Sequence, residues 1–366
     1  MYANPQTQRT MKRFSSNRTL RVACLALVAV GSVASGASQT ASPRGTNNLP
    51  QPYMRVVHPD SDTIQLQIAL RQFVPARGEG PAVWLTGASH IGESNYYRLL
   101  QEHLDAQGLV LFEGVKERPG PAETGESGVS EVDESSLQLT LAQSLGLAFQ
   151  LKAINYRRPH FRNSDLSVPE LQKLLVEGLS EADAGSGTAE LAVLLQIMDG
   201  RSLLGAVVNF GVRLLGTSPK LQALAKVTLI ETIAQLEGDL SQLQGLPPEM
   251  KKLMQVLIES RNAAVLKDLK VELKKRRPAK SVSILYGAGH MPDLERRLRQ
   301  DLKYRPADAR WLTAISVNPA EAGVSEAEMG FVRGLVKWQM QELQKKPEDQ
   351  KPEATKSKTP GGLKLE

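Results

Sequence analysis

A duplicated segment constrains the fold of this chain more than any other feature of its sequence. Residues 82–93 (AVWLTGASHIGE) and 282–293 (VSILYGAGHMPD) share one form: an apolar run, Gly-Ala-x-His, an apolar residue, Gly or Pro, and an acid. Short apolar runs that end at glycine are typical of buried strands, and each copy leads into helical spacing of apolar residues. The sequence therefore predicts two related strand–turn–helix units, each with a histidine at the C-terminal end of its strand.

The segments around the two copies predict an α/β fold. Residues 63–70 alternate between apolar and polar side chains, and residues 109–112 and 311–317 are short apolar runs, so all three are expected to be strands. The helix expected at 94–106 joins two strands, for which a right-handed parallel crossover is the default. The predicted sheet combines the two strand–Gly-x-x-His–helix halves, with a large helical insertion at 135–275 between them.

The insertion has helical apolar spacing almost throughout. Six helices are expected at 137–151, 168–179, 189–198, 203–215, 221–236 and 247–273. The helix at 203–215 is apolar nearly all round, which favours a buried helix and leaves shallow membrane contact as the alternative.

The first 37 residues have the order of a secretory signal. Five of the 45 Lys and Arg residues precede an apolar run at 22–33, and small residues then allow cleavage after Gly36 or Ala37. The run is shorter than the ~20 residues that span a bilayer. We therefore expect an exported, periplasmic or extracellular protein, which stays tethered to the membrane only if the signal is not cleaved.

Composition excludes several classes of protein. Without residues 1–37, 40 basic residues remain against 39 acidic ones, which disfavours a nucleic-acid binder because phosphate binding needs concentrated positive charge. The single cysteine, Cys24, lies in the predicted signal, so any metal would be held by His, Asp and Glu. Residues 38–52 predict a flexible linker and residues 344–366 a disordered polar tail, which leaves the folded domain at 53–343.

His90 and His290 are the first candidates for a functional site. The carboxyl ends of parallel strands meet at one edge of a sheet, where ligands bind. Gly87 and Gly287 permit a tight turn and a close approach of the backbone. Two of only five histidines lie in this repeated frame, which favours a shared site over two separate structural roles. Glu113 directly follows the strand at 109–112 and is expected at the same edge.

Acidic residues close to these histidines allow more than one interpretation. Glu93 and Asp293 each lie three residues after a histidine, a spacing that can place carboxylate and imidazole on one helical face. The preferred alternative is that both acids cap the helices that follow. His90, His290 and Glu113 suit a divalent metal with an open position for water, and they equally suit acid–base chemistry without a metal.

Several of these features together resemble the TraB/GumN family, relatives of the Tiki metallopeptidases. The resemblance rests on the two Gly-x-x-His motifs, on Glu113, and on residues 260–262 (SRN) ahead of the second motif. It covers about residues 53–317. Three segments are similar to the secreted bacterial branch of the family: 87–97 (GASHIGESNYY), 149–156 (FQLKAINY) and 159–166 (PHFRNSDL).

The resemblance implies an α/β fold in which two related halves meet at one site. The residues that it assigns to this site are His90, Glu113, Arg261 and His290. It implies a metal-dependent hydrolase of peptide or amide bonds, with the histidines as metal ligands or proton shuttles and the glutamate as ligand or general base. The arginine would neutralise a substrate carboxylate or a developing oxyanion.

The loop at 156–165 is dense in Arg, His and Asp, and it is expected to cover the site or to bind an anionic group. Asp165 in this loop would support the site, or it would only cap the next helix. The secreted branch has a histidine where this chain has Asn163, so a direct ligand from this loop is not expected.

Two other functions stay open from the sequence. A non-enzymatic, regulatory protein could bind a peptide in the same crevice, and a metal-free hydrolase could use the histidines as acid and base. In every case the expected partner is a peptide or a small molecule, with membrane contact only through an uncleaved signal or a peripheral helix.

Overall fold

The structure is a computed structural model that describes residues 52–114, 123–124, 137–180, 211–235 and 255–344. Its strands are β1 (Met54–Val57), β2 (Ile64–Pro75), β3 (Ala82–Ala88), β4 (Ile91–Gly92), β5 (Leu109–Phe112), β6 (Glu123–Thr124), β7 (Ala148–Phe149), β8 (Phe161–Asn163), β9 (Ser281–Gly287) and β10 (Tyr304–Val317). Its helices are α2 (Ser94–Asp105), α3 (Leu137–Ser144), α4 (Gln150–Ala153), α5 (Val168–Ser180), α8 (Pro219–Gln235), η2 (Val256–Ser260), α10 (Arg261–Leu273), η3 (Ala288–His290), α11 (Met291–Gln300) and α12 (Glu326–Gln344).

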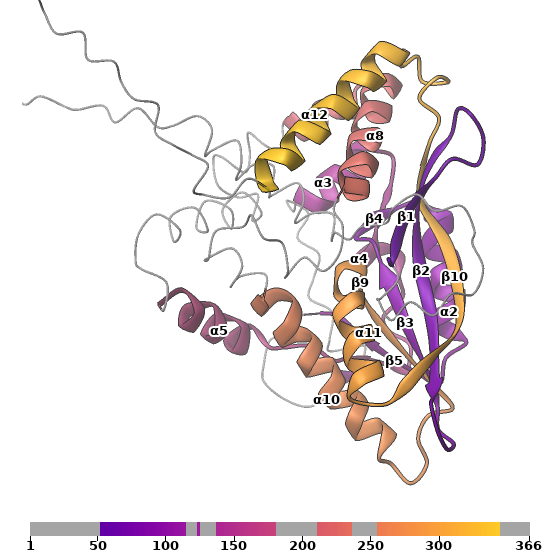
Figure 1. Cartoon of the computed structure of the whole chain (residues 1–366), viewed down its shortest axis with the longest axis vertical. Helices are drawn as coiled ribbons and strands as arrows, with labels where there is room; N and C mark the ends of the chain where they lie inside the picture. Colours follow the sequence, from indigo (N-terminus) through magenta and orange to yellow (C-terminus); the bar gives the residue numbers. More distant parts are fainter. Residues whose placement is uncertain (1–51, 115–122, 125–136, 181–210, 236–254, 345–366) are drawn as a thin grey trace, which may run out of the picture.

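The two strands of the duplicated segment are neighbours in one mixed sheet (Figure 1). β3 pairs with β9 in parallel, from Ala82 opposite Ser281 to Ala88 opposite Gly287. β9 also pairs in parallel with β5, so β9 lies between the two strands that α2 connects. The sheet continues through β8 to β6 on one side. The α/β class predicted from the sequence is therefore confirmed.

β2 joins the antiparallel part of the sheet to the parallel part. It pairs along its length with β10, from Ile64 opposite Val317 to Pro75 opposite Tyr304, and with β1 and then β3 along its other side. The predicted strand at 311–317 thus begins seven residues earlier, at Tyr304. Residues 305–310 are exposed and lack an apolar alternation, so only the pairing with β2 makes them a strand.

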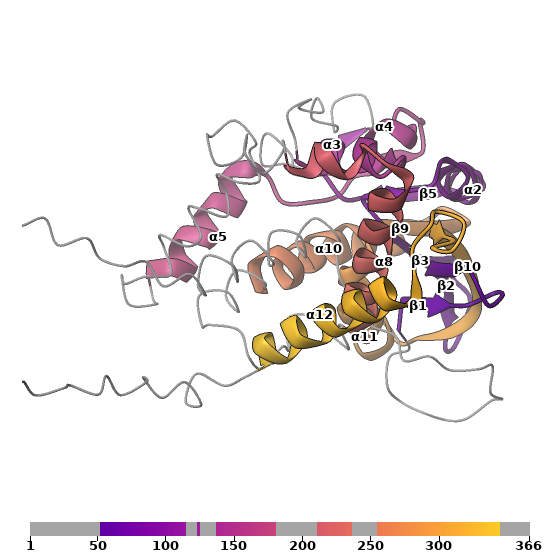
Figure 2. The same ribbon diagram turned by 90° about the horizontal axis from the view of Figure 1, so that it is seen from above.

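Apolar side chains cover both faces of the sheet. Ile68 and Leu70 of β2 belong to the core cluster shared with α2, α8 and α12, whereas Ala69 and Phe73 belong to a second cluster with α10 and α11. This division follows from the two-residue period of a strand. Figure 2 shows α2 and α11 on opposite sides of the sheet.

The helical part differs from the prediction at two described places: β8 within it joins the main sheet beside β5, and the first predicted helix is shorter. The helix expected at 137–151 ends at Ser144, because Gly146 adopts a positive φ of 63° that stops the helix. The next residues form β7, which pairs with β4 just after His90. The helices α5 and α8 lie close to their predicted bounds, and α10 ends at Leu273 as predicted, whereas residues 247–254 of that last predicted helix lie outside the described part.

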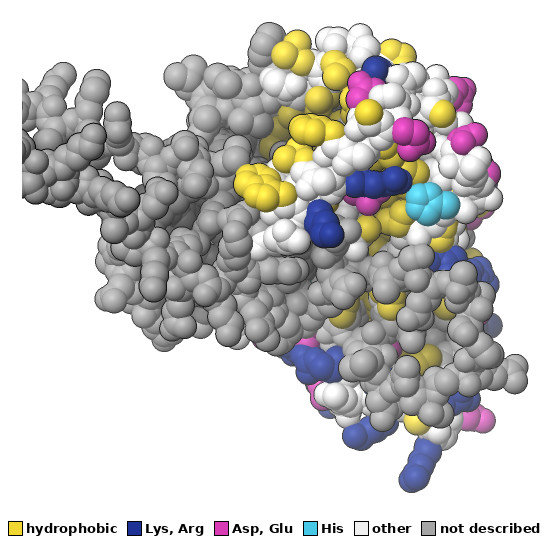
Figure 3. Space-filling view, turned by 45° about the horizontal axis from the view of Figure 1, so that its top comes forward, with side chains coloured by type: hydrophobic (Ala, Val, Ile, Leu, Met, Phe, Trp, Pro, Cys, Tyr) yellow, Lys and Arg dark blue, Asp and Glu magenta, His cyan; other side chains and the backbone are white. Residues whose placement is uncertain are grey.

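Other predictions fall outside the described residues. These are the signal at 1–37, the linker at 38–52 apart from Pro52, the helix at 189–198, most of that at 203–215, and the tail from residue 345. In the described part of the chain, no helix is both long enough and apolar enough to cross a membrane. Figure 3 shows apolar side chains exposed over α12, whose Phe331, Leu335 and Trp338 are between 37% and 70% exposed.

A buried histidine predicts that the fold loses stability in mild acid. His103 of α2 contacts the Thr86 hydroxyl (3.3 Å from Nε2) and the edge of Trp84. Burial, together with the charge of Arg310, lowers the pKa of His103 to about 4. In the unfolded chain the same side chain binds a proton near pH ~6.5. The stability that neutral His103 provides is therefore complete above pH ~6.5, and it is lost as the pH falls from there toward the pKa of His103 in the folded state.

The His103→Gln substitution tests this. Between pH 7.5 and pH 5, we expect the free energy of unfolding to fall by about 2 kcal/mol less in this variant than in the wild type. Urea titrations at both pH values measure the difference. The exposed His58→Gln is the control and should keep the wild-type pH dependence. An unchanged pH dependence in His103→Gln would contradict the prediction.

Candidate functional site

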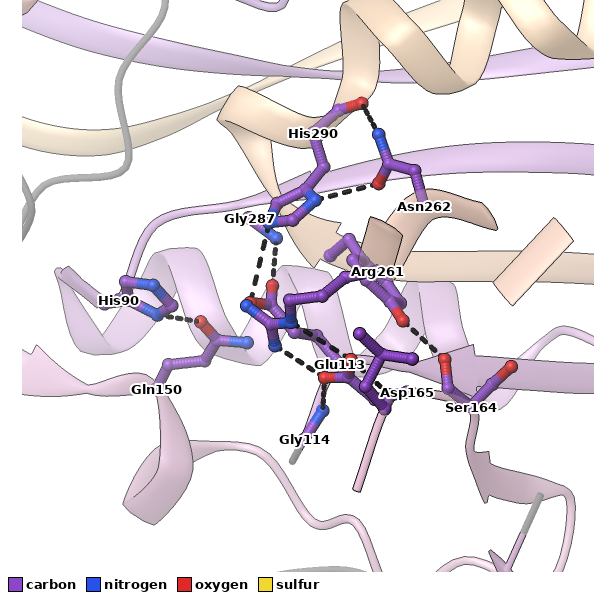
Figure 4. A network of polar contacts seen from close by, with 12 residues as sticks. His90, Glu113, Gly114, Gln150, Ser164, Asp165, Arg261, Asn262, Gly287 and His290 are labelled. Carbon is purple, nitrogen blue, oxygen red and sulfur yellow. Dashed lines mark hydrogen bonds and ion pairs between the residues drawn. The ribbon is translucent and has the colours of Figure 1, made fainter. Parts of the chain in front are cut away.

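Three parallel strands end at the candidate site. His90 follows β3, Glu113 directly follows β5, and His290 is the last residue of the short helix η3 that follows β9. The Glu113 backbone N–H donates to Leu285 O at 2.9 Å, which extends the ladder between β5 and β9 by one residue. Figure 4 shows Glu113 between the side chains that reach the site from β3 and from β9. The structure therefore brings these three residues to one edge of the sheet, as the sequence predicts.

Glu113 lies at the centre of the polar network. Its Oε1 accepts from Arg261 Nη1 at 2.8 Å, and its Oε2 accepts from the Gly287 backbone N–H at 2.7 Å. Burial alone would raise the pKa of Glu113, but the charges of Arg261, His290 and His90 and the Gly287 hydrogen bond lower it to about 2. Glu113 is therefore ionised at neutral pH.

Arg261 joins Glu113 to a second buried carboxylate. Its Nε and Nη2 donate to the two oxygens of Asp165 at 3.0 and 2.5 Å, which is the bidentate geometry that a guanidinium favours. Asp165 also accepts from the backbone N–H groups of Gly114 (3.0 Å) and Leu166 (2.7 Å). Burial lowers the pKa of Arg261, but the two carboxylates raise that pKa by more than burial lowers it, so the arginine stays charged. The side chain predicted to meet a substrate thus binds two protein carboxylates.

Asp165 supports the site and does not cap α5. The cap is made by Ser167, whose Oγ accepts from the Glu170 N–H at 3.4 Å while Glu170 Oε2 accepts from the Ser167 N–H at 2.8 Å. Asn163, where the resembled family has a histidine, is buried at the end of β8 opposite Phe112. The loop therefore reaches the site through Asp165.

His290 is held in one tautomer by an amide. Asn262 Nδ2 donates to the His290 carbonyl (3.1 Å) and to Asp293 Oδ2 (2.9 Å), so its Oδ1 faces His290 Nδ1 at 2.8 Å. Because an amide oxygen only accepts, Nδ1 carries the proton and Nε2 keeps a lone pair. That Nε2 lies 3.7 Å from Glu113 Oε1. Burial lowers the pKa of His290 to about 4 against the opposing effect of Glu113, so His290 is neutral at pH 7.

His90 is held in a similar way by a residue that the sequence did not single out. Gln150 Nε2 donates to the Tyr156 hydroxyl at 3.0 Å, so its Oε1 faces His90 Nδ1 at 3.2 Å. The proton again lies on Nδ1, which leaves the lone pair on Nε2. Gln150 lies in the segment 149–156 that resembles the secreted bacterial branch, and this resemblance was the only feature of the sequence that pointed to it.

The acids that follow each histidine contact neither ring. Glu93 Oε1 accepts from the Ser316 N–H of β10 at 2.8 Å, and Glu93 makes no capping hydrogen bond to α2. Asp293 lies in the first turn of α11, where negative charge suits the helix dipole. It accepts from Asn262 and from Arg297 Nε (2.7 Å). Asp293 therefore positions the amide that holds His290, and Glu93 ties the turn after β3 to β10.

The two glycines have different roles. A Cβ on Gly87 would lie 3.1 Å from Ile68 Cγ2 and 3.2 Å from Ala69 O, so this glycine permits β3 to pass close to β2. Gly287 contributes its N–H to Glu113, as described above.

The donor atoms suit a divalent metal only in part. His290 Nε2 and Glu113 Oε1 are 3.7 Å apart, close to the roughly 3.4 Å expected between two ligands that each lie ~2.1 Å from one ion. Within the described ranges, however, no three His, Cys, Asp or Glu side chains are grouped closely enough to hold a metal. The structure thus brings two of the three predicted ligands together, and His90 would have to move to complete the set.

Comparisons with known proteins do not assign a family. The chain matches no protein-family model, no curated protein and no solved structure. The resemblance to the TraB/GumN family therefore stays a prediction from the motifs.

Replacing Arg261 by Met is expected to destabilise the fold strongly. Glu113 and Asp165 would stay buried without their cation, and breaking such a pair costs about 3–5 kcal/mol. Urea titration at pH 7.5 measures the loss, which should shrink at lower pH because the unpaired carboxylates can then take up protons.

The matched control is Arg98→Met. Arg98 forms an ion pair with Glu102, and both side chains are about 60% exposed, so this pair contributes less than ~1 kcal/mol. Equally small losses in both variants would contradict the structural importance of Arg261.

Proposed function

We propose that this protein is an exported metal-dependent hydrolase of peptide or amide bonds, with His290, Glu113 and His90 as the metal ligands. One observation carries the proposal. His290 donates its Nδ1 proton to the Asn262 amide at 2.8 Å and keeps a lone pair on Nε2, beside an ionised carboxylate. Ligating histidines are typically held by such a hydrogen bond from the second ring nitrogen. A bound divalent ion would supply Lewis-acid polarisation of the substrate carbonyl.

The acidity of Glu113 supports a ligand role over that of a general base. A base is most effective when its pKa lies near the working pH, whereas the pKa of Glu113 is about 2. A carboxylate that stays ionised across the physiological range is well suited to bind a cation. Arg261 and Asp165 then act as positioning residues, because they fix Glu113 through the guanidinium and have no solvent-facing role in the proposal.

His90 is the third ligand in this proposal. It faces the site from the end of β3, it is partly buried, and Gln150 holds its Nδ1 as Asn262 holds that of His290. This correspondence supports the idea that the two strand–Gly-x-x-His–helix halves serve one site. To complete the ligand set, His90 would have to move toward the other two ligands.

A groove near the site, which is lined by none of His90, Glu113 and His290, is the basis for proposing a peptide as the substrate. The groove has a volume of about 670 Å³ and lies between α2 and the α3–β7–α4 segment. Tyr97, Leu139 and Phe149 give it an apolar floor, and Arg98 and Lys152 belong to its polar rim. The same short segment carries Gln150, which does not line the groove itself, so a chain bound there would contact Phe149, the residue before the one that orients His90. Mixed apolar and polar lining suits the side chains of a peptide.

Metal content is the direct test. The purified protein is dialysed against zinc or manganese, washed and analysed for bound metal, alongside His290→Gln, Glu113→Gln and the double variant His90→Ala, His290→Ala. We expect stoichiometric metal in the wild type and in the exposed-residue control His58→Gln, and loss of that metal in the three site variants. Circular dichroism checks that each variant is folded.

Each other outcome excludes part of the proposal. No metal in the folded wild type would exclude a metal mechanism. Peptide hydrolysis that survives exhaustive chelation would favour acid–base chemistry by the histidines. Peptide binding without hydrolysis, in a protein that binds no metal, would favour the non-enzymatic alternative.

The amides that hold the histidines provide a second prediction. Replacing Asn262 by Leu removes the acceptor of His290 Nδ1–H, and loss of such an orienting group lowers metal affinity by about 10–100-fold. Gln150→Leu should do the same through His90. Competition titration with a chromophoric chelator measures the affinity. Exposed Asn95, which bonds only Arg98 on α2, provides the control variant Asn95→Leu, and affinities equal to the control would contradict these roles.

A further inference from the structure

Helix α10 presents two chemically different faces. On its inner side Val265 and Leu269 are buried in the core, and its first residues, Arg261 and Asn262, point into the site (Figure 4). On its outer side Lys267, Lys270 and Lys274 are exposed. We call these three residues the lysine ridge. At 100° per residue they fall within an arc of about 60° on the helix surface, so they form one continuous face.

The positive charge of this region has little compensation nearby. Residues 267–280 contain seven basic and two acidic residues. Both acids are already engaged: Asp268 accepts from the Ser164 hydroxyl at 2.7 Å, and Glu272 accepts from Lys275 Nζ (2.5 Å) and the Ala279 N–H (3.0 Å). Among the described residues, no carboxylate forms an ion pair with the lysine ridge.

Some other exposed cations on the molecule, by contrast, do form ion pairs. Arg98, Arg158 and Lys220 each form an ion pair with a nearby carboxylate, at 2.5–2.8 Å. Outside the predicted signal the chain is almost neutral, so these lysines, which have no ion-pair partner among the described residues, are a local concentration of charge and not a general property of its surface. Concentrated positive charge attracts an anionic partner.

The ridge also contains an apolar contact. Val271 adjoins the ridge, about 40° around the helix from Lys267, and is 59% exposed. Together with Ala263 and the ridge it lines a hollow of about 360 Å³. Ammonium groups around an exposed aliphatic side chain are typical of helices that lie on a lipid surface. Single-stranded nucleic acid would require aromatic side chains for stacking, and none lines this hollow in the described part of the chain.

We propose that the lysine ridge of α10 binds the surface of a membrane rich in anionic phospholipid, with Val271 as its apolar contact. The phosphate groups of the lipids would accept from the three ammonium groups. This inference uses the proposed export of the protein but not its hydrolase activity. The lysine ridge and the site residues lie on different faces of α10. Substitutions in one can therefore be made without altering the other.

Vesicle sedimentation tests the proposal. The purified protein is mixed with vesicles of phosphatidylcholine alone or with phosphatidylglycerol, at low and at high salt. We expect binding only with phosphatidylglycerol and less of it at high salt, because screening weakens surface charge. The triple variant Lys267→Gln, Lys270→Gln, Lys274→Gln should bind on the order of 100-fold more weakly, since each lysine near an anionic surface contributes about fivefold.

The matched control is Arg98→Gln, Arg158→Gln, Lys220→Gln, which removes the same charge from exposed, ion-paired positions and should bind like the wild type. Wild-type binding by the ridge variant, equal binding to both kinds of vesicle, or capture by DNA but not by phosphatidylglycerol vesicles would each overturn the proposal. Metal content measured on the same samples separates this result from the hydrolase proposal: loss of lipid binding with unchanged metal content concerns the ridge alone.

Discussion

The parallel pairing of β3 with β9 is the interaction on which the rest of the structure depends. It joins segments 200 residues apart in the chain, with Ala82 opposite Ser281 and Ala88 opposite Gly287. Because the strands run in the same direction, their histidines leave the sheet at one edge, and the pairing of β9 with β5 adds Glu113 there. The backbone ladder thus fixes the relative positions of residues from three distant parts of the sequence before any of their side chains interact.

The site that results is a buried polar network, and its electrostatics follow from that burial. Charged groups removed from water need partners. Here one guanidinium binds two carboxylates, and backbone N–H groups from Gly114, Leu166 and Gly287 donate further hydrogen bonds to them. The same lack of water keeps His290 neutral. An ionised carboxylate and a neutral imidazole therefore face each other at the edge of the sheet, which is the donor pair that a cation would bind.

Much of the fold follows from local patterns. The strand at 109–112 and the helix from Ser94 lie where apolar spacing predicts them. Differences arise where a non-local contact or one backbone angle decides. β10 extends to Tyr304 because β2 is available as a partner, and α3 stops at Ser144 because Gly146 adopts a positive φ. Neither effect is visible in the periodicity of the segment itself.

The sequence by itself determined that two Gly-x-x-His turns end strands, that Glu113 ends another, and that Arg261 and Asn262 precede the second turn, because spacing and residue type are local properties. The contacts of these side chains are visible only in the folded chain. The structure assigned Arg261 to Asp165 and Glu113, Asn262 to His290, and Gln150 to His90. It also placed Asp293 behind Asn262 and Glu93 against β10. A hydrogen bond depends on the distance and direction between two groups in space. Here the partners come from elements that are far apart in the sequence, so the sequence does not show that they are close in the fold.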